Sequence, residues 1–187
     1  VNTEKMHRQG GRMTTDDALG MAMEGSGFFQ VLMPDGRIAY TRNGSFTHNN
    51  EGILTTSSGY VVQPEIQIPE GASNINVSGN GLISVTVAGN AEAEEVGQLT
   101  LADFSNRRGL QPIGENFLTE TEASGPAVIS NPQEEGAGKI IQGALEASNV
   151  NVVQELVEMI ETQRAYEVSS KAITSVDEML RFIANNL

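Results

Sequence analysis

The sequence predicts a mainly β protein, with a small antiparallel β domain of complex fold followed by a long, coiled-coil-like C-terminal α-helix. Two observations lead to this fold class. Turn-forming residues recur about every 8 to 10 residues through the middle of the chain, a spacing typical of short antiparallel strands. Residues 152 to 187 contain no Gly and no Pro, and their apolar side chains recur at three- and four-residue spacing, as on a helix.

The predicted helix is too long to be covered by the rest of a 187-residue chain, because at ~1.5 Å per residue it would extend ~54 Å. The mean spacing of its apolar stripe, about 3.4 residues, is below the helical ~3.6 and favours left-handed wrapping around a partner helix. An ordinary amphipathic helix lying on its own domain is the alternative, which this length disfavours. The stripe is the candidate assembly interface: Val153, Leu156, Ile160, Gln163, Tyr166, Ile173, Val176, Leu180, Ile183 and Leu187, with Ser170 at its weak middle.

The start of the helix is the best-defined boundary in the sequence. Asn151 is a good N-cap, since its side chain can accept a hydrogen bond from the free backbone N–H of Gln154. Gln154 can in turn reach back toward the cap, as in a capping box.

Composition excludes several classes of function. The net charge is −13, and residues 51 to 138 hold twelve acidic residues against only Arg107 and Arg108. Such a surface repels phosphate backbones and anionic lipids, so we expect no nucleic-acid partner and no membrane binding. The chain has no Cys. It also lacks an apolar run of the ~20 residues needed to span a bilayer and the basic-then-apolar pattern of a cleavable signal peptide, so insertion into a membrane is not expected and any export uses another route.

Four segments follow from the pattern of turns and apolar runs. We expect an extended lead-in or connector over residues 1–24, the antiparallel β domain over 25–138, a second connector over 139–151 and the helix over 152–187. Within the β domain, Pro34-Asp35-Gly36-Arg37 predicts a hairpin turn. The run GQLTLADF predicts one strand, residues 123–138 a mobile loop, and Leu110, Ile113, Phe117 and Leu118 the last contributors to the core.

No constellation of residues predicts catalysis, and we expect no cofactor and no metal. His7 and His48, the two histidines, are not placed among carboxylates at metal-ligand spacing. Gly25-Ser26-Gly27 is too short for a dinucleotide-binding fingerprint and precedes Phe28-Phe29 rather than a helix, so we interpret it as a turn.

Three stretches, in order, closely resemble the bacterial flagellar axial proteins of the rod and hook. GSGFFQVLMPDGRIAYTRNGSF (residues 25–46) is similar to the opening of the family's β domain, and EGILTTSSGYVVQP (51–64) to the segment that follows. LEASNVNVVQELVEMIETQRAYEVSSKAI (145–173) resembles its C-terminal signature, in which a helix starts after Ser-Asn-Val. The form of this last stretch is most similar to that of distal rod subunits.

The resemblance implies a structural subunit that polymerises helically with itself into a hollow drive shaft, with terminal helices in the inner tube and β domains facing outward. Its implied partners are proximal rod and hook proteins and the surrounding periplasmic and outer-membrane ring proteins. It implies a place in the basal body and export by the flagellar export apparatus. Members of this family begin with a long N-terminal helix, so the resemblance also implies that this chain starts downstream of that helix.

Two alternatives stay open. One is a proximal rod or hook subunit. The other, from a different class, is a secreted β-rich binding module with an oligomerising helix, which would need an exposed aromatic platform; the chain has three Tyr and no Trp.

Overall fold

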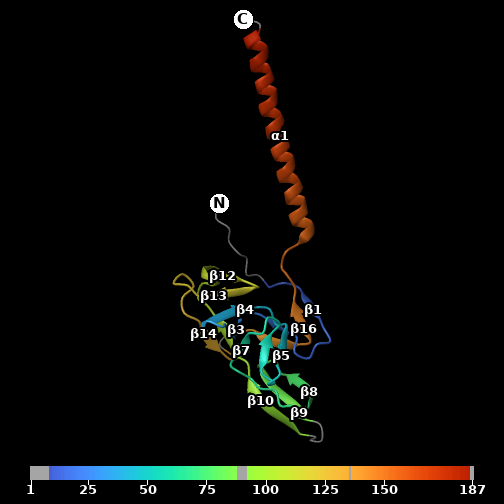
Figure 1. The fold of residues 1–187 in the computed structure, drawn as a ribbon, viewed down its shortest axis with the longest axis vertical. Helices are drawn as coiled ribbons and strands as arrows, with labels where there is room; N and C mark the ends of the chain where they lie inside the picture. Colours follow the sequence, from blue (N-terminus) through green and yellow to red (C-terminus); the bar gives the residue numbers. More distant parts are fainter. Residues whose placement is uncertain (1–8, 88–91, 135, 186–187) are drawn as a thin grey trace. The chain divides into compact units, whose positions relative to one another are not determined.

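The computed structural model describes residues 9–87, 92–134 and 136–185. It divides the chain into two compact units, Val1–Ser148 and Asn149–Leu187. The described part of the first unit consists of short β-strands and one 3₁₀ turn, and the second contains the single α-helix α1 (Val152–Asn185) (Figure 1). The predicted fold class, mainly β with a long C-terminal helix, is confirmed.

The largest sheet has seven strands, all joined by antiparallel pairs, in the order β12-β13-β4-β3-β7-β6-β5. The predicted hairpin turn joins β3 to β4, with Leu32 opposite Ile38, and Gly36 adopts the positive φ of +82° that this turn requires. The strands are β3 (Phe29–Leu32), β4 (Ile38–Thr41), β5 (Phe46–His48), β6 (Leu54–Thr56), β7 (Val61–Gln63), β12 (Gln111–Gly114) and β13 (Phe117–Thr119).

Four smaller sheets complete the β unit. A three-stranded sheet has the order β10-β9-β8, and three two-stranded sheets pair β1 with β16, β2 with β15 and β11 with β14. Their strands are β1 (Arg12–Thr14), β2 (Met21–Glu24), β8 (Ala72–Val77), β9 (Leu82–Val87), β10 (Ala93–Gln98), β11 (Leu101–Asp103), β14 (Val128–Ser130), β15 (Lys139–Gln142) and β16 (Ala144–Glu146); the 3₁₀ turn η1 is Arg107–Gly109.

The β unit is wider than the predicted 25–138. Strands β1 and β2 lie in the expected lead-in (1–24), and β15 and β16 lie in the expected connector (139–151). Each lead-in strand pairs with a connector strand. The two flanks of the β unit therefore satisfy each other's backbone hydrogen bonds, a long-range pairing that local sequence signals do not report.

The core consists of three adjoining clusters of buried side chains. The largest joins β2 and β15 to the large and three-stranded sheets and includes Met21, Phe29, Leu54, Ile83 and Ile140. A second is built on edge-to-face rings, with Phe104 packed against both Phe28 and Tyr40. The third brings Val31, Ala39 and Phe117 together.

Three local expectations differ from the structure. GQLTLADF forms two strands, β10 and β11, because the chain turns at Leu99, which is fully buried and donates to the Gly81 carbonyl. Ile113 is exposed, since it sits where the β12–β13 register shifts between Pro112 and Gly114. The expected loop 123–138 contains β14 and the buried Ser124, whose hydroxyl donates to the Thr121 carbonyl. Leu110, Phe117 and Leu118 are buried, as predicted.

Candidate assembly surface

Helix α1 begins where the sequence predicts. The Asn151 side-chain oxygen accepts from the backbone N–H groups of Val153 (3.2 Å) and Gln154 (3.4 Å), and the Asn151 carbonyl accepts from the Glu155 N–H. These bonds satisfy the free donors of the first turn. The Gln154 side-chain nitrogen donates along the helix to Glu158, and the reciprocal half of the capping box stays a prediction.

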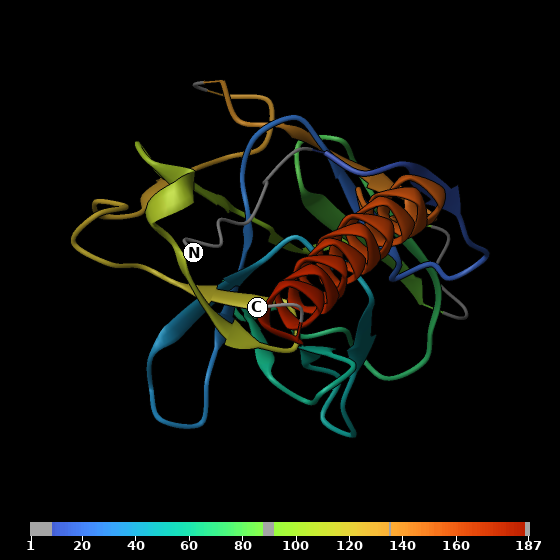
Figure 2. The ribbon, with the colours of Figure 1, turned by 90° about the horizontal axis from the view of Figure 1, so that it is seen from above.

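The described positions of the predicted stripe are all exposed to solvent. At ~1.5 Å per residue α1 is a rod of ~51 Å, drawn as one uninterrupted helix in Figures 1 and 2. Gln163 and Ser170 are exposed. Leu187 lies outside the described residues. The large apolar and aromatic side chains are 49% to 76% exposed: Val153, Leu156, Ile160, Tyr166, Ile173, Val176, Leu180 and Ile183.

Apolar side chains also lie off this stripe. At ~100° of turn per residue, Val157, Val168 and Met179 project to other sides of the helix. They too are about half exposed or more. The stripe prediction missed them because it followed a single line of apolar residues along the helix. An apolar surface on several sides suits a helix that contacts more than one neighbour, rather than a two-stranded coiled coil.

Three hydroxyl groups along α1 donate to carbonyls of the helix itself. Thr162 donates to the Glu158 carbonyl, Ser169 to that of Ala165, and Thr174 to those of Ser170 and Lys171. A hydroxyl that already has an acceptor adds little desolvation cost when it is buried. Packing another helix against this part of α1 therefore leaves few polar groups without partners.

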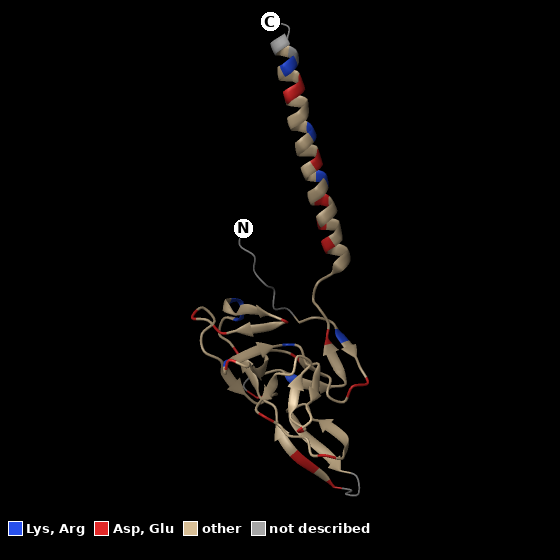
Figure 3. Cartoon of the chain, in the orientation of Figure 1, with Lys and Arg blue, Asp and Glu red and all other residues tan. Residues whose placement is uncertain are grey.

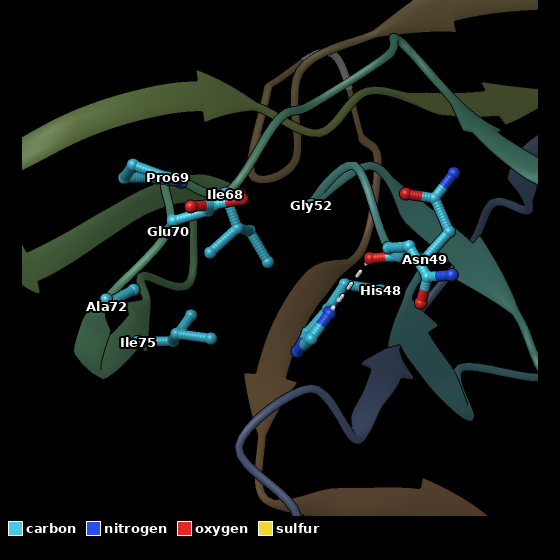
Figure 4. Close-up of a pocket in the computed structure, with 10 residues that line it drawn as sticks. His48, Asn49, Gly52, Ile68, Pro69, Glu70, Ala72 and Ile75 are labelled. Carbon is cyan, nitrogen blue, oxygen red and sulfur yellow. Dashed lines mark hydrogen bonds between the residues drawn. The ribbon is translucent and has the colours of Figure 1, made fainter.

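The β unit has a groove between the β5–β6 turn and the segment that leads into β8 (Figure 4). Its volume is about 350 Å³, with apolar side chains such as Ile68 and Ile75 on one side and His48 and Asn49 on the other. The His48 Nδ1 lies 3.3 Å from the Asn49 carbonyl oxygen. No group of three or more His, Asp or Glu within residues 9–87, 92–134 and 136–185 could hold a metal ion. His7 lies outside the described residues.

Comparison with known proteins identifies the family. The model of the flagellar hook protein FlgE/F/G D1 domain matches residues 22–85, and that of the flagellar basal body rod FlgEFG protein C-terminal region matches residues 141–187. The flagellar basal-body rod protein FlgG of Buchnera aphidicola subsp. Acyrthosiphon pisum is 50% identical over 97% of this chain and 70% of its own length. The protein of the same name from Caulobacter vibrioides is 44% identical over 95% of this chain and 68% of its length.

The chain belongs to the FlgG family of flagellar basal-body rod proteins. It is thus a structural subunit of the flagellar rod, a component of the axial assembly of the basal body. The hook protein FlgE of Salmonella typhimurium is also similar, at 41% identity, but over 54% of this chain and 26% of the hook protein. The FlgG family therefore accounts for far more of the chain than the hook protein does.

Together, the two family models match residues in both structural units. The first runs from β2 to β9, and the second contains β16 and continues through α1. No helix in the described residues has the length and apolarity required to cross a bilayer. The exposed apolar side chains of α1 are interpreted as a surface for protein–protein contacts, because exposed apolar surface of this extent is typical of such sites.

Proposed function

We propose that this chain is a subunit of the distal rod, which polymerises helically into the hollow shaft that transmits torque from the motor to the hook. The observation that supports it best is α1, a helix of 34 residues whose large apolar side chains are half exposed or more along the described length. Exposed apolar surface of this extent marks a site where neighbours pack, and repeated contacts between identical subunits build a filament. In the shaft α1 lines the inner tube and the β unit faces outward.

The partners of this subunit follow from its place in the shaft. Other copies of the chain lie around it, with proximal rod proteins on the motor side and hook proteins on the side of the hook. The periplasmic and outer-membrane ring proteins surround the shaft. The subunit reaches this place through the flagellar export apparatus. Its role is structural and not enzymatic, and it contacts neither nucleic acid nor the membrane interior.

The secreted binding module is the weaker alternative. The Phe and Tyr side chains of the β unit are buried or half-buried, and Tyr60 packs edge-to-face on Phe117. A carbohydrate platform needs exposed aromatic faces. A glycan-binding screen discriminates the two: we expect no glycan to bind.

The first prediction concerns the stripe on α1. Replacing Leu156 and Ile160 with Asp places two charges where neighbouring helices pack, and charges buried without partners are strongly unfavourable. We expect cells with this double variant to form no distal rod, as counted by electron microscopy of purified basal bodies. The thermal unfolding midpoint of the β unit should be unchanged, because both positions are outside its core.

A matched control uses Val128 and Ile129, which are 53% and 58% exposed on β14. Replacing both with Asp adds the same charge to exposed apolar positions outside the helix, and we expect rods to form. Normal rods from the Leu156→Asp/Ile160→Asp variant would refute the assignment of the stripe. Loss of rods in both double variants would show that added charge, rather than helix packing, prevents assembly.

A further inference from the structure

Both terminal segments of the β unit meet at one place, the strand pair β1–β16 (Figure 1). Arg12 lies opposite Glu146 in the register of this pair, and the Ala147 N–H donates to the Gly11 carbonyl at 2.7 Å. The contact is close: a Cβ on Gly10 would lie 1.8 Å from the Ala147 carbonyl oxygen. The segment that enters the β unit and the segment that continues to α1 are thus held side by side.

One side chain links this strand pair to the large sheet. Arg42, directly after β4, donates from Nε to Glu146 Oε2 at 2.9 Å. Its Nη1 donates to the carbonyls of Gly25 and Gly27, each at 3.0 Å. The other oxygen of Glu146 accepts from the Gly10 N–H at 2.9 Å. The Arg42–Glu146 pair therefore joins the β2–β3 turn, the end of β4, β16 and the lead-in.

This ion pair is more sheltered than the others for which the structure gives exposures. The Arg42 and Glu146 side chains are 21% and 11% exposed, whereas Arg37 and Asp35, at a hairpin tip, are 69% and 44% exposed. A sheltered pair is screened little by salt, and removal of one partner leaves the other largely buried without its counter-charge. The planar guanidinium also fixes the directions of its donors. Arg42 therefore restricts movement between the segments that it joins.

The neighbouring strand β15 has a separate attachment. Gln142 accepts from the Val77 N–H at 3.0 Å, and its amide donates to the carbonyls of Ala18 (2.8 Å) and Ile75 (2.7 Å). These bonds hold β15 against the three-stranded sheet without Arg42. Loss of the Arg42–Glu146 pair should consequently loosen β1 and β16 while β15 and the core sheets stay in place.

We propose that Arg42 is a positioning residue that couples the terminal segments of the chain mechanically to the large sheet. Torsion that enters the β unit through residues 144–147 passes from Glu146 to Arg42 and so to β4. Without the pair, the three residue pairs of β1–β16 remain tied to β2 and the turn after it by Gln9, which bonds the Met23 carbonyl and the Gly25 N–H, and by the exposed Arg12–Glu24 pair, but they lose their direct link to β4. A two-stranded ribbon is only marginally stable by itself, so we expect it to yield under load. This inference rests on the proposed rod function, since only a shaft that turns under load requires such coupling.

The test compares Glu146→Gln with the matched control Asp35→Asn. Each replaces one carboxylate of an Arg pair by its isosteric amide, the first in the sheltered pair and the second at the exposed hairpin tip. In the purified full chain, we expect amide hydrogen exchange at Gly10 and Ala147 to accelerate about tenfold or more in Glu146→Gln, as expected for loss of a hydrogen bond to a charged group. Exchange at Val31 and Val62 in the core sheet should stay at the wild-type rate in both variants.

The second readout is motility under load. Labelled rods are first counted in purified basal bodies, and swimming speed is then measured as the viscosity of the medium is raised. We expect Glu146→Gln cells to carry rods in normal number, to swim normally in thin medium, and to lose speed more steeply than wild type with viscosity. Asp35→Asn cells should follow the wild-type curve.

Either of two outcomes would overturn the coupling. One is a wild-type exchange pattern in Glu146→Gln, and the other is a viscosity dependence of Glu146→Gln equal to that of Asp35→Asn. If Glu146→Gln does not fold, Arg42→Lys decides, because a single ammonium keeps the charge but cannot replace both the Nε bond to Glu146 and the Nη1 bonds to the Gly25 and Gly27 carbonyls. Arg42→Lys cells should lose speed with viscosity more steeply than wild type, and a wild-type curve would refute the proposal. Absence of the labelled wild-type chain from rods would instead refute the proposed function itself.

Discussion

Tyr40 is a residue whose ionisation is coupled to the stability of the β unit. Its ring is buried against Phe104, and its hydroxyl donates to Glu120 at 3.4 Å. Burial, together with the negative charge of Glu120, raises the pKa of Tyr40 from 10.0 to about 12. Between these two pH values the unfolded chain releases this proton while the folded chain keeps it, so stability falls as pH rises through that range.

Tyr40→Phe should remove this part of the pH dependence. The Phe ring retains the contact with Phe104 but has no proton to release. We expect urea midpoints of wild type and variant to converge as pH rises from about 10 toward about 12, with the variant less stable than wild type below that range because it lacks the hydrogen bond to Glu120. Parallel midpoint curves across this interval would show that Tyr40 titrates alike in the folded and unfolded chain.

Residue roles were predictable where they depend on neighbours in sequence and not where they depend on distant ones. Asn151 was found as a cap because its partners lie two and three residues away. The role of Arg42 was not predicted, since its partner Glu146 is 104 residues further along the chain. Nothing local marks Arg42 as different from the exposed Arg37.

At the scale of elements, turn and capping residues allowed the β3–β4 hairpin and the start of the helix to be predicted. They did not predict the strand pairings between the two flanks of the β unit. The β3–β4 hairpin and the start of α1 follow from Gly36 and Asn151. The pairings of β1 and β2 were not predicted because their partners, β16 and β15, come from the opposite end of the β unit. A three-residue strand such as β1 also has too few residues for an alternating pattern to be visible.

Two glycines allow the cost of a left-handed backbone to be separated from the cost of a steric clash with an added Cβ. Gly36 and Gly52 have similar positive φ values, +82° and +77°. A Cβ on Gly36 would meet nothing within 4 Å, whereas one on Gly52 would lie 2.1 Å from the Ile68 carbonyl oxygen. That carbonyl belongs to a residue whose own N–H donates to Gly52 at 2.8 Å, so it cannot withdraw without cost.

We expect Gly36→Ala to destabilise the β unit by about 1–2 kcal/mol, the cost of a left-handed backbone for a residue with Cβ. Gly52→Ala should cost more, because the clash adds to the same backbone term. Chemical denaturation of both variants measures the difference. Equal losses of stability would mean that the β5–β6 turn relaxes freely around the added methyl group.

At the scale of the whole molecule, the acidic charge and the apolar surface are carried by different parts of the chain. Glu92, Glu94 and Glu95 are exposed at the β10 end of the three-stranded sheet, and Figure 3 shows this acidic stretch in red. Exposed apolar side chains are most frequent on α1. In a shaft with the helices inside, the outer surface is then acidic, which we propose limits adhesion to the rings that surround it. The Debye length of about 8 Å confines this effect to closely apposed surfaces.

Charge reversal at Glu92, Glu94 and Glu95 tests this role of the outer surface. Replacing the three with Lys should reduce swimming speed without reducing the number of rods, because the charged tips then attract any acidic lining of the rings and add drag. Replacing them with Gln removes charge without reversing it and should give an intermediate speed, which makes the response graded. The defect should shrink as the ionic strength of the medium that reaches the periplasm is raised, because screening weakens exposed charges. Wild-type speed in the Lys variant with full rod numbers would refute the proposed role, and loss of rods would place these residues in a subunit contact instead.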